Sequence, residues 1–162
     1  ALTLPISSAA LSIILGLSGL PAGAATVGCS AQMIGFAVAS FRENKWDGLL
    51  AQGIGTAMLQ ISNIVKNPLI WIPPTLTSAI LGPLATVVFQ MENNPAGGGM
   101  GTSGLVGQIM TWQTMAGSRS AGLLLFQILL LHFILPAILS FVFSEIMRKK
   151  GWIRFGDMKL NI

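Results

Sequence analysis

The chain has 162 residues, of which 52% are hydrophobic and only 9% are charged. Soluble domains normally carry about a quarter charged residues. A chain this short also has too little interior to bury four long uncharged runs, so an ordinary soluble protein is excluded. The net charge of +4 does not indicate a nucleic-acid partner, because five of the nine Lys and Arg residues lie in a short tail after Ser144. We therefore expect an all-α integral membrane protein embedded in the lipid bilayer.

The first 41 residues contain no charged side chain, about twice the length that one spanning helix needs. Gly and Pro residues between Gly16 and Gly23 interrupt this run, so we expect two membrane segments with a break there. Cys29 is the only cysteine of the chain, which excludes an intramolecular disulfide. We expect it to be buried as a small hydrophobic residue.

Residues 42–47 form a charged turn with two basic residues and Trp46, which is typical of the cytoplasmic membrane surface. Residues 48–65 are expected to follow as a membrane helix with one polar face, made of Gln52, Thr56, Gln60 and Asn63. This face can line a substrate path, or it can bond to a neighbouring helix.

Residues 67–74 end in Pro73 and Pro74, so we expect no continuous helix there and interpret this stretch as a second broken or re-entrant element. Three further membrane segments are expected, at residues 74–90, 103–117 and 120–144. The segment 103–117 covers only about 22 Å at 1.5 Å per residue, short of the roughly 30 Å hydrocarbon core. A re-entrant or broken helix is the natural interpretation of such a short piece.

These segments give about six membrane passages in a single domain over residues 1–162. The basic residues after Ser144 predict that the tail, residues 145–162, is cytoplasmic. With the turn at 42–47 also inside, Lys66 and Arg119 are expected outside. Because no Met stands at position 1, we expect the chain to be a piece of a longer protein.

The sequence also contains a short internal similarity. Pro21-Ala-Gly23 recurs as Pro95-Ala-Gly97, and each copy is followed by Gly-x-Ser, at an offset of about 74 residues. In the six-segment topology the two copies begin on opposite sides of the membrane. This predicts a three-plus-three inverted repeat, a plan that places transporter sites at the repeat interface.

A glycine-rich stretch, residues 92–104, is the first candidate site. It contains the only acid between Asp47 and Glu145. Its glycines allow the backbone to approach a ligand, while Thr102 or Ser103 is expected to cap the next helix and leave N–H groups free for a hydroxyl or an anion. The alternative is a flexible connection with a capped helix. No Walker motif is present.

His132 lies within an apolar run, four residues before Pro136. It can bind a hydroxyl or carry a proton, or it can bond to a carbonyl freed by the proline. One His and one Cys on distant segments give no metal site. The carboxylates form no catalytic pair, and the sequence indicates neither catalytic residues nor a cofactor.

Three runs carry a resemblance to a known family: residues 67–86 (NPLIWIPPTLTSAILGPLAT), 91–105 (MENNPAGGGMGTSGL) and 148–159 (RKKGWIRFGDMK). They resemble the EIIC-like membrane proteins of the bacterial phosphotransferase system, in the branch that includes the perfringolysin O regulator proteins. The resemblance covers essentially the whole chain, and members of that branch extend further at the N-terminus. It implies a multi-pass protein of the bacterial inner membrane that binds a sugar and carries it inward.

By this resemblance, phosphorylation of the sugar would need a separate EIIB partner, because the chain has no EIIA or EIIB domain. The protein is also expected to form a homodimer. A membrane sensor or regulator that binds a solute without transporting it stays open as the alternative function. The expected substrate-binding residues are Glu92, Asn93, Asn94, Gly97, Gly98, Gly99, Gly101, Thr102, Ser103 and His132.

Overall fold

The computed structural model describes residues 2–3 and 6–160, which are folded into helices of several kinds. The α-helices are α1 (Ser8–Ile14), α2 (Leu20–Ala39), α3 (Phe41–Leu50), α4 (Ile61–Lys66), α5 (Ile72–Pro83), α6 (Pro95–Met100), α7 (Val106–Met115), α8 (Ala121–Leu129) and α9 (Leu135–Lys149). Short π and 3-10 turns join them: η1 (Ala51–Gly55), η2 (Ala57–Gln60), η3 (Pro68–Trp71), η4 (Leu84–Val88), η5 (Ser103–Leu105) and η6 (Leu130–Ile134). Among the described residues the only isolated β-bridge pairs Gly19 with Asn93.

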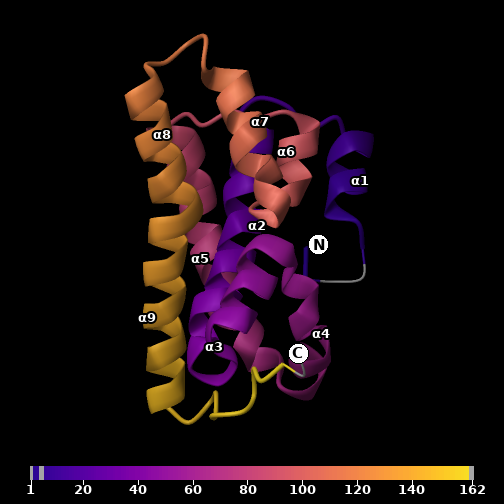
Figure 1. The fold of residues 1–162 in the computed structure, drawn as a ribbon, viewed down its shortest axis with the longest axis vertical. Coiled ribbons are helices and arrows are strands. Elements are labelled where there is room, and N and C mark those ends of the chain that lie inside the picture. The colour runs from indigo at the N-terminus through magenta and orange to yellow at the C-terminus, as the bar shows by residue number, and fades with distance from the viewer. Residues whose placement is uncertain (1, 4–5, 161–162) are drawn as a thin grey trace.

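Three helices of the described chain are long and apolar enough to cross a membrane: Leu20–Ala39, Pro68–Val88 and Ala121–Lys149. They confirm the all-helical membrane class, with three such spans where about six membrane segments were expected. The three lie side by side, with α2 against both α5 and α9 (Figure 1). At Gly35 a side chain would not fit, because a Cβ there would lie 2.6 Å from Ser140 Oγ and 2.8 Å from Pro74 Cβ.

The break expected within the first 41 residues is present. Helix α1 ends at Ile14, and α2 begins at Leu20 after Gly19, whose φ of 63° is in the region that favours glycine. Pro21 lies in the first turn of α2, where its missing N–H costs no hydrogen bond.

The expected break at Pro73 and Pro74 was wrong. Residues 68–88 form one long helical stretch, in which η3 leads directly into α5. Both prolines lie in the first turn of α5, where the α-helix itself makes no bond to an N–H, and the 3-10 turn η3 supplies the helical turn before them. The helix therefore begins before the prolines rather than after them.

The continuous helix expected over residues 48–65 was also wrong. The chain bends at Lys45 (φ 51°), widens into the π turn η1, and becomes extended at Thr56 (φ −158°, ψ 138°) before η2 and α4. Thr56 Oγ1 then accepts a hydrogen bond from Met58 N at 3.1 Å, which starts the returning helix. Residues 41–66 thus form a hairpin, called here the first hairpin.

Residues 95–115 form a second hairpin, in which α6 leads through the turn at 101–105 into α7 (Figure 1). The tips of the two hairpins meet about halfway along the long helices. The Thr102 hydroxyl donates to Gly53 O, and the Ser103 hydroxyl donates to Gly55 O at 2.9 Å. The hairpins therefore approach one another from opposite ends of the molecule.

The position expected for Lys66 was wrong. Because the first hairpin returns to the end where it began, Lys66 lines the same cavity as Lys159 of the tail. The next residue, Asn67, donates to Asp157 Oδ2 at 2.8 Å. Arg119 lies at the opposite end of the fold, where it donates to Gln127 Oε1 at 2.8 Å and to Gln90 O at 3.1 Å.

The two Pro-Ala-Gly copies do not form the expected inverted arrangement. Their helices, α2 and α6, both begin at the Gly19–Asn93 bridge and run in the same general direction, because Gly98 packs on Ala22 and Gly101 packs on Cys29.

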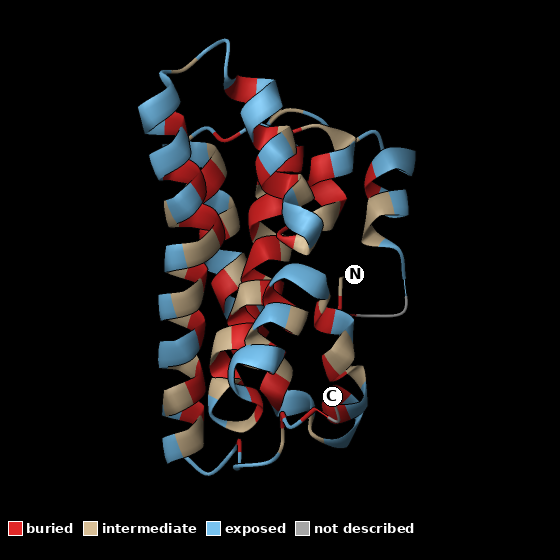
Figure 2. Cartoon of the chain, in the orientation of Figure 1, coloured by how far each residue is buried: buried red, intermediate tan, exposed pale blue. Residues whose placement is uncertain are grey.

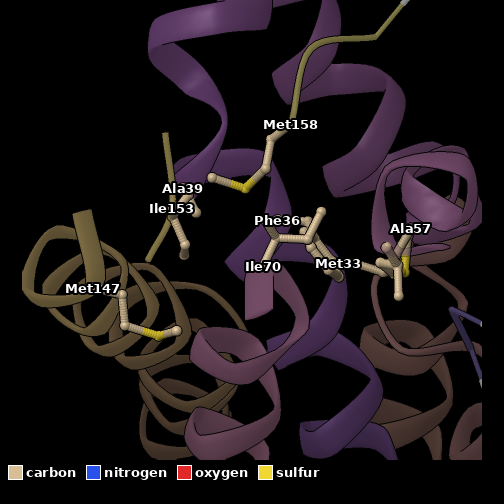
Figure 3. Packing of buried hydrophobic residues seen from close by; sticks show 9 residues of the cluster. Met33, Phe36, Ala39, Ala57, Ile70, Met147, Ile153 and Met158 are labelled. Carbon is tan, nitrogen blue, oxygen red and sulfur yellow. The ribbon is translucent and has the colours of Figure 1, made fainter. Parts of the chain in front are cut away.

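Burial follows this architecture (Figure 2). Helix α2 is largely buried along its length, while α9 exposes one face. A hydrophobic cluster packs below the hairpin junction and is shown in Figure 3: Met33, Phe36, Ala39, Ala57, Ile70, Met147, Ile153 and Met158. Two of its members, Ile153 and Met158, come from the tail, which is therefore folded back onto the helices.

Candidate functional site

The acid and amides that precede α6 have three different environments. Glu92 is exposed, Asn93 is buried, and Asn94 caps α6 by accepting a hydrogen bond from Gly97 N at 3.0 Å. The cap expected from Thr102 or Ser103 was wrong: neither side chain caps a helix, and both bond across to the first hairpin.

Asn93 forms the polar centre of this region. Its Nδ2 donates to Thr26 Oγ1 at 2.7 Å, to Thr111 Oγ1 at 2.9 Å and to Gly107 O at 3.1 Å. Its Oδ1 accepts from Asn94 N at 2.8 Å. These bonds join α2, the beginning of α6 and α7, so Asn93 fixes the second hairpin against the central helix.

The glycines of α6 allow close packing. Gly97, Gly98 and Gly99 are all buried. A Cβ at Gly98 would lie 2.8 Å from Ser12 Oγ, and one at Gly99 would overlap the backbone of Ala9. Ser8 Oγ also donates to Gly99 O at 2.6 Å. Gly101 turns the chain with φ of 55° against Cys29. These glycines bring α6 into contact with α1 and α2.

The hairpin junction exposes backbone groups that no helix uses. Carbonyls of Gly53 and Gly55 lie where the π turn η1 gives way to extended Thr56, so they are free to accept from the hydroxyls of Thr102 and Ser103. Within a membrane, backbone groups that have no partner in a helix occur only where other protein covers them or where they line a cavity.

His132 lies beyond the junction in η6 and is buried. Its Nδ1 is 3.0 Å from Gln108 Nε2. Since the amide nitrogen can only donate, Nδ1 accepts in this pair. Gln108 Oε1 is buried and has no hydrogen-bond partner among the described residues. An unpaired buried acceptor of this kind needs an explanation.

Gln108 also borders a groove of about 300 Å³ between α7 and α8. Trp112 and Gln113 line it, along with apolar side chains from both helices. His132 does not bond to the glycine-rich residues directly. The first turn of α7 connects them, because Gly107 O accepts from Asn93 while the adjacent Gln108 meets His132.

Sequence reasoning missed Gln108, Thr111 and Thr26. The first two lie three residues apart on one face of a short apolar segment, a spacing that could have marked them. Thr26 stands among small residues in α2 and gives no such signal.

The polar side chains of residues 48–65 form hydrogen bonds within the protein. Gln60 Nε2 donates to Gln52 Oε1 at 2.8 Å and to Met158 O at 3.0 Å. Asn63 Nδ2 donates to Gln60 Oε1 and Lys159 O, both at 2.9 Å. The partners are thus the folded-back tail and, for Gln52, the Ser40 hydroxyl at the end of α2, which accepts from Gln52 Nε2 at 2.9 Å. Over the described residues no three His, Cys, Asp or Glu side chains gather as metal ligands would.

Three long helices, with two polar hairpins packed against the central helix α2, define a multi-pass membrane protein with broken helices. A family model described as phosphotransferase system, EIIC, matches residues 1–160. The chain therefore belongs to the EIIC family of the phosphotransferase system, as its sequence resemblance predicted. Membership indicates a membrane component of sugar-transporter type. No curated protein and no solved structure matches the chain.

Proposed function

We propose that this protein binds a small carbohydrate where the two hairpin tips meet and carries it across the inner membrane for phosphorylation by a separate EIIB partner. One observation carries the proposal. The hydroxyls of Thr102 and Ser103 donate to the carbonyls of Gly53 and Gly55, which accept no bond within their own helix. The contact lies about halfway along the spanning helices (Figure 1). A sugar hydroxyl both donates and accepts, so it can replace either side of these bonds.

The lengths of the hairpin arms support a re-entrant placement. Helix α7 has 10 residues and extends about 15 Å, half of a roughly 30 Å hydrocarbon core. We infer that each hairpin enters the hydrocarbon core only part of the way and returns to its own side. Broken helices that meet at this depth are typical of transporter sites.

The expected site residues divide into two roles in this proposal. Thr102, Ser103 and His132 contact the solute, with Gln108 Oε1 as a further acceptor and exposed Glu92 at the mouth of the path. Asn93, Asn94, Gly97, Gly98, Gly99 and Gly101 position the second hairpin.

The distribution of charge supports a cytoplasmic C-terminus. Eight of the nine Lys and Arg residues belong to the first hairpin or follow Glu145, and Arg119 alone lies at the other end. An excess of basic residues is typical of the cytoplasmic side. We infer that the tail and the base of the first hairpin face the cytoplasm.

Uptake of radiolabelled sugars into proteoliposomes tests the function. The full chain should give saturable uptake of at least one sugar, and Thr102→Val with Ser103→Ala should lower it at least tenfold, since two hydroxyl contacts are lost. Thr114→Val with Ser118→Ala is the matched control, because these hydroxyls bond only within their own turn, to Met110 O and Met115 O.

Three outcomes are informative. Uptake that depends on Thr102 and Ser103 supports transport through the junction. Thermal stabilisation by a sugar without uptake would overturn transport in favour of the sensor. Folded protein that neither binds nor takes up any sugar of a broad panel contradicts both functions.

A further inference from the structure

The first hairpin and the residues from Glu145 onward hold eight of the nine Lys and Arg residues and four of the five Asp and Glu residues. Glu43 pairs with Arg148 at 3.3 Å, and Glu145 pairs with Arg42 at 3.1 Å. Asp157 Oδ2 accepts from Asn67 Nδ2 at 2.8 Å and from Arg154 N at 2.7 Å. Neither Lys66 nor Lys159 forms an ion pair among the described residues, so positive charge stays in excess at this end although Asp157 keeps its own charge there.

A half-enclosed cavity of about 400 Å³ opens at this end, between α4 and the tail. Its polar lining consists of Ser62, Asn63, Lys66, Gly156 and Lys159, and two leucines complete the wall. No carboxylate is among these lining residues. Two lysines thus line one space that is large enough for a small molecule or a lipid headgroup.

Hydrogen bonds hold the tail side of this cavity against the first hairpin. Lys159 follows Met158, whose carbonyl accepts from Asn44 at 2.8 Å and from Gln60 at 3.0 Å. The carbonyl of Lys159 itself accepts from Asn63 at 2.9 Å. On the other side, Ser62 and Lys66 are four residues apart on α4 and so lie on the same face.

We propose that this cavity binds a phosphate group, either of an anionic phospholipid or of a soluble phosphate ester. An ammonium group is a compact point charge suited to phosphate oxygens, and the exposed Ser62 hydroxyl supplies a neutral hydrogen-bond donor beside it. Basic pockets on the cytoplasmic side of membrane proteins bind anionic headgroups by the same chemistry. The site lies at the base of the first hairpin and is separate from the sugar site at its tip.

Native mass spectrometry of the purified full chain in detergent tests this site, with phosphatidylglycerol as the anionic probe and phosphatidylcholine as the neutral-headgroup comparison. We expect phosphatidylglycerol to bind preferentially. Lys66→Gln with Lys159→Gln should weaken its binding roughly thirtyfold, from the loss of two charges near a phosphate. Lys66→Arg with Lys159→Arg should retain binding, which shows that loss in the glutamine variant is not a folding defect.

Lys149→Gln with Lys150→Gln is the matched control, because it removes two charges at the same end but outside the cavity. This pair should change phosphatidylglycerol binding by less than about threefold. Equal loss in the two glutamine pairs would show general electrostatic attraction and would overturn the site.

Inorganic phosphate and glucose 6-phosphate distinguish the two sources. Phosphatidylglycerol binding that neither soluble probe displaces identifies a lipid site. Binding of a soluble probe that is lost in the Lys66 and Lys159 glutamine variant identifies a site for a phosphate ester. If neither the lipid nor a soluble phosphate binds to folded protein, the proposal is wrong.

Discussion

Gly19 and Asn93 hydrogen-bond to each other through both backbone groups: Gly19 N donates to Asn93 O at 2.9 Å, and Asn93 N donates to Gly19 O at 3.1 Å. The pair fastens the beginning of α2 to the beginning of α6. Because the Asn93 side chain also bonds to Thr26 of α2, one residue ties the second hairpin to the central helix by two separate means.

Replacing Asn93 by Leu should destabilise the protein by about 2 kcal/mol, since Thr26, Gly107 and Thr111 lose a donor in a buried site. Unfolding in mixed micelles with increasing denaturing detergent measures the change. Glu92→Gln, at an exposed neighbour, should stay within about 0.5 kcal/mol. Equal stability of the two variants would show that the Asn93 network contributes little.

Gly35→Ala should destabilise by about 1 to 3 kcal/mol, because the added methyl group meets both Ser140 and Pro74 where three spanning helices converge. Gly122→Ala is the matched control. A Cβ at Gly122 meets nothing within 4 Å, so this change should be neutral or stabilising by up to about 1 kcal/mol. Thermal unfolding of both variants in the same detergent compares them, and a neutral Gly35→Ala would contradict the close approach.

Glu43→Gln should destabilise the tail and the fold by about 3 kcal/mol, because it leaves the largely buried Arg148 without its partner. Glu43 Oε1 also accepts from Gly156 N at 2.8 Å. Hydrogen exchange at residues 151–160 should therefore become faster. Glu145→Gln breaks a more exposed pair with Arg42 and should cost at most about 1 kcal/mol. Unchanged exchange in the tail would argue against this anchor.

Thiol labelling tests the revised topology. In a Cys29→Ser background, Lys66→Cys and Lys159→Cys should react with a membrane-impermeant reagent from the same side, because the two residues line one cavity. Arg119→Cys should react from the opposite side. Labelling of Lys66→Cys together with Arg119→Cys would restore the six-passage topology and refute the first hairpin.

Much of the fold could be predicted from the lengths of the runs that contain no charged residue. The break near Gly19, the long span that follows Ser120 and the short segment before Gly117 all follow from hydropathy and from Gly and Pro positions. The span predicted over residues 74–90 was found, but it begins earlier, at Pro68. The prediction failed for residues 48–65, because an uncharged stretch of that length can either cross the membrane as one helix or fold back as a hairpin. The hairpin is stabilised by hydrogen bonds from Gln60 and Asn63 to the carbonyls of Met158 and Lys159. Because these partners are about 100 residues away in the sequence, local patterns do not reveal them.

The candidate site was less predictable, for a physical reason. The glycine-rich sequence correctly marks a place where backbones approach closely, but it does not say whether a ligand or another helix approaches. Here α1 and α2 lie against Gly98 and Gly99. Thr102 and Ser103 were recognised as polar, but their partners, Gly53 and Gly55, have no side chain and so carry no polar signal in the sequence.

The hairpin junction also sets how readily a path could open. Two side-chain hydroxyls on two carbonyls close the tips, and each such bond contributes about 1 kcal/mol net. Parting these two bonds costs on the order of 2 kcal/mol, which corresponds to tips apart in a few per cent of resting molecules. A solute that satisfies the same four groups in the parted state would raise that population without any change in the long helices.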